Sequence, residues 1–339
     1  MKVLSLFDGM ACGMIAMQFA GMEVESYNAY EIDKYAIKTA QHNFPMIKEH
    51  GDVFGADFTQ YEGVDFLIGG SPCTYWSIAQ TKNRETVASG KGWELFSQYV
   101  QALHEAKPKY FIYENNKSMS KAIRASIDET FGFEAVLINS ALVSAQNRQR
   151  LYWVGKRNDD GTYSKVPVEQ PEDRGILLRD ILESGIAWHE KSYCITATEY
   201  KGSNPQQTLT KHRRTMVAEP VEPRCVAQCG RYPENPKLRV AGLPTEQMFE
   251  AREDGKTHQV YEVRNGLITI KGKQYPIKLK DGYYIIRKLT VRECMRLQTV
   301  PEWYEFPVSD SQAYKMLGNG WTCEVIAHIL KDLKENNNG

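Results

Sequence analysis

Short apolar runs alternate with helical patterns over residues 1–157, and this alternation restricts the fold more than any other feature of the chain. The runs that read as strands are KVLSLF, VESYNA, DFLIGG and YFIYE, and between them lie helical patterns such as MIAMQFAG, KYAIKTAQHNF and LFSQYVQALHEA. Strands that alternate with helices form a parallel sheet covered by helices. The sequence therefore predicts an α/β domain built on a parallel sheet.

The pattern changes after residue 157. Residues 158–286 are rich in Pro, Gly and Tyr and contain alternating segments such as GLITIKGKQYPIKLKDGYYIIR, which predict hairpins of a smaller β-rich domain. A supporting helix is expected in residues 287–310, where Thr290 and Glu293 have the spacing of a capping box. Residues 311–339 indicate two helical pieces around a Gly-Asn-Gly break, and their long apolar face predicts that they pack back against the first domain.

Composition limits the classes of protein to which the chain can belong. It has no positively charged leader and no run of about 18 apolar residues, so we expect a cytoplasmic protein without a membrane segment. Seven irregularly spaced cysteines favour reduced thiols over a disulfide framework. Cys225 and Cys229 lack a second pair with zinc-like spacing, so no metal site is predicted.

Charge is balanced over the whole chain but not along it. Lys and Arg together number 42, and so do Asp and Glu. Residues 187–288 carry 18 basic against 11 acidic residues, while the rest of the chain carries 24 against 31. Such a basic segment fits contact with a nucleic acid. It fits lysine-rich loops and edge strands that serve solubility equally well.

Polar or reactive residues stand at the carboxyl ends of the predicted strands, which an open α/β sheet places at its ligand-binding edge. The loop FDGMACG follows the first strand and opens a helix, where glycines let a ligand approach. Glu31 ends the second strand, where a carboxylate can accept both hydroxyls of a ribose. For the loop, the alternative is a tight connection without a ligand. For Glu31, it is a carboxylate exposed to solvent. Because dinucleotide and phosphate-loop patterns are missing, a nucleoside without a phosphate chain fits better, as in S-adenosylmethionine, with Asp52 accepting from its adenine.

Cys73 cannot be assigned from its immediate neighbours. It follows Pro72 in DFLIGGSPCTYWS, and a cysteine at the end of a strand is most often a small buried spacer. No histidine lies close in sequence to act as its base, so a Cys/His pair is not indicated. A reactive thiol would need activation by a helix N-terminus or a nearby cation. The order of the other motifs has to decide between spacer and nucleophile.

A set of motifs follows along the chain in an order and spacing that resemble the DNA (cytosine-5)-methyltransferase family. They are FDGMACG, Glu31, Pro72-Cys73, Glu114-Asn115-Asn116, QNRQR with its alternating Gln146, Arg148 and Arg150, RKLTVRE, and Gly318-Asn319. The resemblance covers residues 1–157 and 287–330, and GGSPC with FDG particularly resembles the vertebrate de novo enzymes. It implies a Rossmann-like S-adenosylmethionine-dependent methyltransferase fold, with residues 158–286 as a target-recognition domain.

The resemblance also implies a reaction, namely methyl transfer from S-adenosylmethionine to carbon 5 of a cytosine flipped out of double-stranded DNA. Cys73 would add to ring carbon 6 and Glu114 would act at ring nitrogen 3, while Arg150 would hold the base oxygen and Arg148 would help in positioning. The residues implied for the cofactor are Phe7, Asp8, Gly9, Gly13, Glu31, Ile32, Asp52, Pro72 and Asn319. The residues expected to contact DNA are Gln146, Thr208, Leu209, Arg213 and Arg214. We expect the protein to be a monomer. The sequence leaves open whether a restriction enzyme that recognises the same DNA sequence is its partner.

Four features depart from the family pattern, namely Asp8 with Ala11-Cys12 in the first loop, Glu94, Asn116 and Gly320-Trp321, and three of their residues leave alternatives open. Glu94, Asn116 and Trp321 are expected near the methionine end of the cofactor, so a related enzyme that transfers a modified group is one alternative. A tRNA cytosine-5 methyltransferase and a non-catalytic DNA-binding relative are two others. The size of the basic insert favours DNA over tRNA, and the complete set of expected catalytic residues favours an enzyme.

Overall fold

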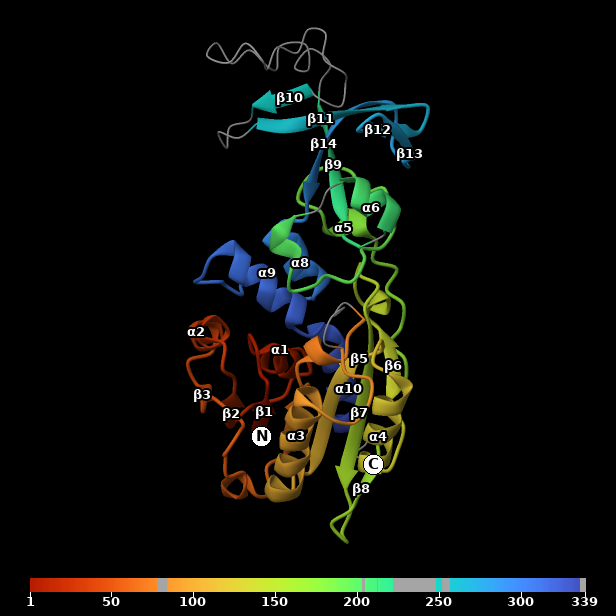
Figure 1. Cartoon of the computed structure of the whole chain (residues 1–339). Coiled ribbons are helices and arrows are strands. Elements are labelled where there is room, and N and C mark those ends of the chain that lie inside the picture. Colours follow the sequence, from red (N-terminus) through yellow and green to blue (C-terminus); the bar gives the residue numbers. More distant parts are fainter. Residues whose placement is uncertain (79–83, 203–204, 212, 222–247, 252–256, 336–339) are drawn as a thin grey trace.

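The chain folds into a larger α/β body and a smaller β-rich domain, as Figure 1 shows. The computed structural model describes residues 1–78, 84–202, 205–211, 213–221, 248–251 and 257–335. The carboxyl ends of the parallel strands of the body point toward the small domain (Figure 1). The junction between the two parts therefore lies at the edge of the sheet where ligands are expected.

An eight-stranded sheet forms the centre of the body, in the order β3-β2-β1-β4-β5-β7-β6 with β8 beside β7. Its strands are β1 (Lys2–Leu6), β2 (Ser26–Tyr30), β3 (Lys48–Glu49), β4 (Phe66–Gly69), β5 (Tyr110–Asn116), β6 (Val136–Asn139), β7 (Gln149–Arg157) and β8 (Tyr163–Lys165). The strands from β3 to β5 are parallel, but β7 runs antiparallel to β5, β6 and β8. The predicted parallel sheet is therefore present in the strands β1 to β5, and β7 adds an antiparallel part that we did not predict from the sequence. Only residues 140–148 separate β6 from β7, too few for the crossover that parallel neighbours need.

Helices cover both faces of the sheet. They are α1 (Cys12–Phe19), α2 (Lys34–Asn43), α3 (Lys91–Ala106), α4 (Lys121–Phe131) and α10 (Cys323–Glu335). On one face, α1, α2 and α10 pack in one core with strand residues such as Val3 and Ile68. On the other face, α3 and α4 pack with Leu4 and Phe111. The helix α10 contacts α1, so the C-terminal segment packs against the body.

The small domain is built on an antiparallel sheet in the order β13-β12-β11-β14-β9, with β10 beside β11. Its strands are β9 (Met216–Val221), β10 (Met248–Ala251), β11 (Thr257–Arg264), β12 (Leu267–Ile270), β13 (Lys273–Pro276) and β14 (Gly282–Lys288). Two short helices precede them, α5 (Leu178–Ile181) and α6 (Pro205–Lys211). The predicted hairpins are therefore present. Among the helices that the structure describes, none has the length and apolar character that crossing a bilayer needs.

The first boundary expected from the sequence falls inside a hairpin of the body. Residue 157 ends β7, whose partner β8 extends the main sheet, and Ile181 still packs in the core of the body. The body therefore continues past residue 157, because β8 needs the edge of the main sheet for its hydrogen bonds. Cys225 and Cys229, which were considered for metal binding, lie outside the described residues.

Two further helices, α8 (Val291–Leu297) and α9 (Asp310–Asn319), connect the small domain to α10. The capping box at Thr290 and Glu293 is confirmed, since each side chain accepts a hydrogen bond from the backbone N–H of the other residue. Glu293 also accepts Arg287 of β14 at 2.8 Å, and the same guanidinium donates to Glu219 of β9 at 2.7 Å. Glu293 is 0% exposed, so this ion pair is buried where the small domain joins the body.

We expect Glu293→Ala to lower the free energy of unfolding by about 3 kcal/mol, because the change leaves a largely buried guanidinium short of a partner. The matched control is Glu302→Ala. Glu302 pairs with Arg296 of the same helix at 2.6 Å but is 53% exposed, so its loss should cost less than about 1 kcal/mol. Urea denaturation followed by circular dichroism measures both variants. Equal losses would contradict a special role for the buried pair.

Candidate active site

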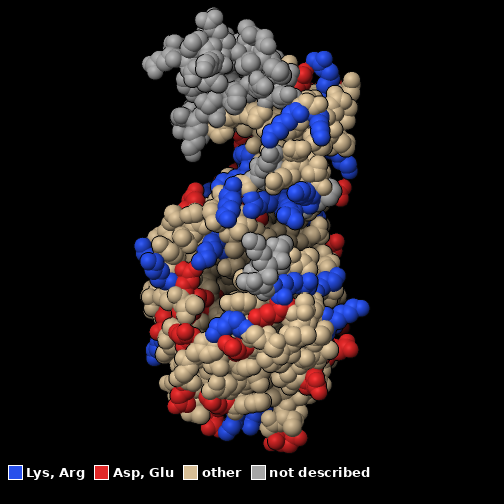
Figure 2. All heavy atoms as spheres, viewed as in Figure 1, with Lys and Arg blue, Asp and Glu red and all other residues tan. Residues whose placement is uncertain are grey.

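A cavity of about 1070 Å³, here called the central cavity, lies where the body meets the small domain. Its walls come from five stretches of chain, which are residues 73–78, 116–118, 147–150, 194–198 and 213–214, together with the end of α9. Figure 2 shows Lys and Arg side chains gathered around the hollow between the two domains, and Arg213 and Arg214 lie on the wall of the cavity. The cavity therefore combines the ends of adjacent sheet strands with a basic rim.

Cys73 lies on the wall of the central cavity, at the start of the short 3₁₀ turn Cys73–Tyr75 that follows β4. The preceding glycines bring this turn close to β5, since a Cβ on Gly70 would lie 2.8 Å from both the carbonyl oxygen and Oε2 of Glu114. Burial raises the pKa of the Cys73 thiol, and Arg150 and Arg148 oppose that effect only in part. The thiol is therefore placed for chemistry but is not ionised by its surroundings alone.

Glu114 receives a donor on each of its carboxylate oxygens. Its Oε1 lies 3.0 Å from Nε of Arg150 in β7, and its Oε2 accepts the indole N–H of Trp321 at 3.0 Å. The sequence prediction placed Trp321 near the methionine end of a cofactor. In the structure, Trp321 contacts the carboxylate of Glu114.

The two arginines of QNRQR have different surroundings. Arg150 lies on the wall of the central cavity, beside Glu114. Arg148 is 3% exposed, and it donates to the carbonyl oxygens of Ile195, Gly318 and Gly320 at 2.8 to 3.1 Å. Arg148 therefore joins distant chain segments and, unlike Arg150, is not among the residues that line the central cavity.

Cys194 is a residue of the site that sequence reasoning missed. It lies on the wall of the same cavity, and its sulfur accepts Nη1 of Arg148 at 3.3 Å and Nη2 of Arg150 at 3.9 Å. Burial alone would raise the pKa of this thiol, but the two guanidinium groups outweigh burial and hold the pKa below its ordinary value. No motif around Cys194 marks this environment, which depends on how residues 194–198 fold over β7.

Two predicted DNA contacts are contradicted by burial. Gln146 is 0% exposed, and its amide binds the carbonyl of Leu297 and the N–H of Ile195. Thr208 is buried in the short helix α6. Gln146 therefore links the segment before β7 to Leu297 and Ile195, and its side chain does not face solvent. Of the predicted DNA contacts, Arg213 and Arg214 remain on the wall of the central cavity.

The loop after β1 and the end of β2 meet as predicted. Phe7, Gly9 and Ala11 all have positive φ values, of 58°, 63° and 60°, so the loop turns sharply before α1. Gly9 N–H donates to Oε2 of Glu31 at 2.9 Å, and Oε1 accepts the N–H groups of residues 32 and 33. Gly13 has a packing role, because a Cβ there would lie 2.4 Å from Cδ1 of Ile68.

A cluster of carboxylates lies beneath this loop. Oδ1 of Asp8 accepts the hydroxyl groups of Ser5 and Tyr27 at 2.5 and 2.6 Å, while its buried Oδ2 has no partner. Both carboxylate oxygens of Glu49 are also buried without a partner. Burial, followed by its two acidic neighbours Asp8 and Glu31, raises the pKa of Glu49 to about 8. Burial likewise raises the pKa of Asp8 to about 6. Sequence reasoning missed Glu49, which no motif contains.

The remaining predicted cofactor residues are exposed on the described surface. They are Ile32, Asp52, Pro72 and Asn319, of which Asn319 lies on the wall of the central cavity. Of the other departures from the family pattern, Asn116 also lines the central cavity. Glu94 pairs with Lys91 at 3.2 Å on the surface of α3.

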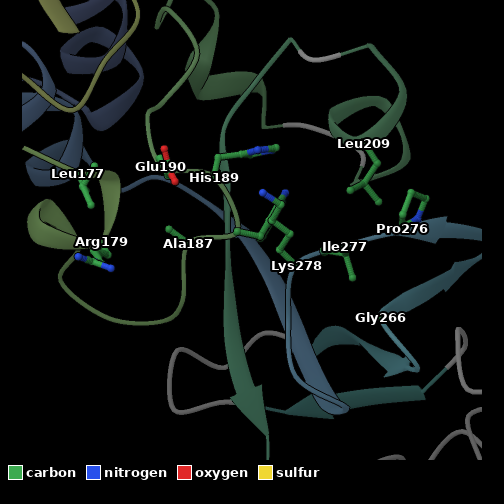
Figure 3. A pocket seen from close by; sticks show the side chains of 11 residues that line it. Leu177, Arg179, Ala187, His189, Glu190, Leu209, Gly266, Pro276, Ile277 and Lys278 are labelled. Atoms are coloured by element: carbon green, nitrogen blue, oxygen red, sulfur yellow. The ribbon is translucent and has the colours of Figure 1, made fainter.

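A second cavity, of about 690 Å³, lies between α5, α6 and the β12–β13 hairpin. Figure 3 shows the side chain of Lys278 extending toward His189, with Leu209 and Pro276 on the opposite side. This cavity shares no lining residue with the central cavity. Leu209, which was predicted to contact DNA, therefore lies in a different pocket from Arg213.

Comparison with known families and proteins places the geometry in context. A family model described as C-5 cytosine-specific DNA methylase matches residues 1–335. The chain is similar to the orphan methyltransferase M.SPRI of Bacillus phage SPR, with 34% identity over 98% of this chain and 97% of the relative. It is also similar to the type II methyltransferase M1.ScrFI of Lactococcus lactis subsp. cremoris, with 30% identity over 98% of this chain and 78% of the relative.

Solved structures share the fold at lower sequence identity. The Dnmt2 methyltransferase of S. pombe superposes with a TM-score of 0.60 at 14% identity, covering 100% of this chain and 99% of that one. A mutant of the DNMT2 of Spodoptera frugiperda gives a TM-score of 0.59 at 18% identity, covering 98% of this chain and 99% of that one. These likenesses confirm the Rossmann-like fold with its smaller domain.

In the native protein, the ionisation of Glu49 should lower the free energy of unfolding as the pH rises, and we expect Glu49→Gln to abolish this dependence. The pKa of Glu49 is about 8 in the folded protein and has an ordinary value of 4.5. Because the folded state holds a proton that the unfolded state releases between these values, the free energy of unfolding falls as the pH rises from 4.5 toward 8. The variant should therefore gain stability relative to the native protein at pH 8 but not at pH 4.5. Urea denaturation at both values tests this. Parallel pH curves would contradict it, and Glu305→Gln, at a site that is 73% exposed, is the control.

Proposed function

This chain belongs to the family of C-5 cytosine-specific DNA methylases, and we propose on that premise which of its residues perform the reaction and how. It is a DNA (cytosine-5)-methyltransferase, and its cofactor is S-adenosylmethionine. The observation that supports our assignment is that Cys73 and Arg150 line one cavity, with Glu114 held against Arg150 at 3.0 Å. The nucleophile is Cys73, and Glu114 and Arg150 are the groups that prepare the base.

Carbon 5 of cytosine is a weak nucleophile, because it belongs to an electron-poor ring. The Cys73 thiol loses its proton, and the sulfur forms a bond to carbon 6 while Glu114 hydrogen-bonds to or protonates ring nitrogen 3. The electron pair released by this addition makes carbon 5 enamine-like. When S-adenosylmethionine is bound, carbon 5 would accept the methyl group that the cofactor supplies, and the cofactor sulfur would keep the electron pair of the broken bond. Loss of the proton that carbon 5 still carries then re-forms the double bond between carbons 5 and 6, and Cys73 leaves as thiolate. Since burial raises the pKa of the free Cys73 thiol, its deprotonation depends on the bound base and the neighbouring arginines.

The cofactor supplies the electrophilic methyl group, and the acidic edge of the sheet fits such a ligand. S-adenosylmethionine carries hydroxyl, amino and ammonium groups, all of which are hydrogen-bond donors. The unpartnered buried oxygen of Asp8 and the carboxylate of Glu31 are acceptors at the ends of β1 and β2. We assign these two residues, the loop residues Phe7 and Gly9, Ile32, Asp52, Pro72 and Asn319 to cofactor binding.

The substrate of the family is DNA, and we infer that this chain acts on double-stranded DNA as a monomer. The small domain presents Arg213 and Arg214 on the wall of the central cavity, where they can neutralise phosphates while a flipped cytosine reaches Cys73. Relatives named both type II and orphan methyltransferases occur. We therefore propose to search the neighbouring genes for a restriction enzyme that cuts the same DNA sequence. We place the reaction in the cytoplasm, where the DNA is.

We expect Cys73→Ala to lower turnover by at least about 10³-fold while DNA binding persists, because the variant lacks the sulfur that adds to the ring. Nucleoside mass spectrometry measures 5-methylcytosine in DNA after incubation with the cofactor. DNA that contains 5-fluorocytosine should form a stable covalent complex with the native enzyme but not with the variant, since fluorine at carbon 5 blocks the final elimination. The buried Cys294→Ala is the control. Turnover by Cys73→Ala would overturn the assignment.

We expect Arg213→Gln to weaken DNA binding about equally for all sequences and to reduce the slope of log affinity against log salt by about 1, as the loss of one phosphate contact requires. Fluorescence anisotropy with labelled duplexes at several salt concentrations measures both quantities. The control is Lys331→Gln on α10 of the body, which should change neither. An unchanged salt slope for Arg213→Gln would place the DNA elsewhere.

A further inference from the structure

The sulfur of Cys194 lies where two buried or half-buried guanidinium groups converge. Arg148 donates to it at 3.3 Å and Arg150 contacts it at 3.9 Å. Cys194 comes from the segment that leads into the small domain, whereas Arg150 lies in β7 of the body and Arg148 directly precedes that strand. The thiol therefore contacts Arg150, which pairs with Glu114, although Cys194 belongs to none of the sequence motifs.

We propose that Cys194 is a positioning residue of the methyl-transfer reaction, whose sulfur is the anionic acceptor that fixes Arg148 and Arg150. This inference rests on the proposed function, because it assigns to Arg150 the task of holding Glu114 and the target base. Cys194 itself does not need to touch the base. Its effect passes through Arg150, whose Nε lies 3.0 Å from Glu114.

The balance of charge supports an anion at this position. Among the partners that the structure describes for the two guanidinium groups, Glu114 is the one carboxylate. The other acceptors of Arg148 are the neutral carbonyl oxygens of Ile195, Gly318 and Gly320. A charge buried in protein is costly unless it is paired. A thiolate at Cys194 supplies the second negative charge that the pair of arginines otherwise lacks.

The protonation of the two thiols in the cavity agrees with this assignment. Burial would raise the pKa of Cys194, but Arg148 and Arg150 together bring it below the ordinary value. For Cys73, burial dominates and the pKa is raised. Burial opposes the charge on Arg150, yet Cys194 first and Glu114 second raise its pKa further. In the free enzyme, the thiolate is therefore favoured at Cys194 over Cys73.

The contacts of Cys194 also close a ring around the site. Trp321 binds Glu114, Glu114 binds Arg150, Cys194 joins Arg150 to Arg148, and Arg148 donates at 2.8 Å to the carbonyl of Gly320, next to Trp321. Within this ring, Cys194 is the link between the two guanidinium groups. Its removal should let Arg150 turn away from Glu114 while the backbone contacts of Arg148 persist.

Kinetics of three variants separate charge from shape. We expect Cys194→Ala and Cys194→Ser to lower kcat by about tenfold or more with little change in the KM for the cofactor, because Arg150 loses its orientation. Cys194→Asp restores a negative charge in a similar volume and should retain kcat within about threefold. Thermal unfolding checks that each variant is folded. Equal losses in all three variants, or unchanged kcat in Cys194→Ala, would overturn the proposal.

Alkylation of the native enzyme gives a second test that needs no variant. Iodoacetamide reacts with thiolates, so peptide mass spectrometry at pH 7 should find Cys194 modified faster than Cys73, with its rate reaching a plateau at lower pH. Faster modification of Cys73 would contradict the proposal. This result does not depend on the proposed function. If the proposed function were wrong, Cys73→Ala would still turn over or would still be trapped by DNA that contains 5-fluorocytosine.

Discussion

The assembly of the site depends on one buried cation, the guanidinium group of Arg148. A charge that is shielded from water must find hydrogen-bond acceptors or destabilise the fold. Arg148 finds them in the segment around Ile195 and in the turn from Gly318 to Gly320, which are far from it in the sequence. The guanidinium group thereby connects three parts of the chain, which are the start of β7, the segment around Ile195 that leads into the small domain, and the end of α9. Removing it would separate the walls of the central cavity.

Much of the site could be predicted, because its main residues follow strands that are neighbours in the sheet. Cys73 follows β4, Glu114 lies in β5, and Arg150 lies in β7, which is the next strand in the observed order. For Cys73 and Glu114, which stand at the carboxyl ends of parallel strands, the meeting at one edge follows from topology. Arg150 stands near the start of β7 and reaches the same edge because that strand is antiparallel. The order of the motifs then supplied the roles that no single residue could reveal, above all for Cys73, whose surroundings in sequence contain no base.

Other features depend on contacts between distant segments and left no local pattern. Cys194 gains its environment only when its segment folds over β7, and Trp321 reaches Glu114 only because α9 ends beside the cavity. Gln146 shows the opposite error. Its spacing with the arginines predicted a contact with DNA, but not that its amide would bind the carbonyl of Leu297 in a buried position. The antiparallel direction of β7, in contrast, could have been read from the short stretch between residues 140 and 148.

The close contact at Gly318 has a consequence for the width of the central cavity. A Cβ on Gly318 would lie 2.1 Å from the carbonyl carbon of Thr196, so the end of α9 and the segment around Thr196 meet backbone to backbone. Both segments line the central cavity. Any residue with a side chain at position 318 would therefore push these two walls apart and change the space in which a base is held.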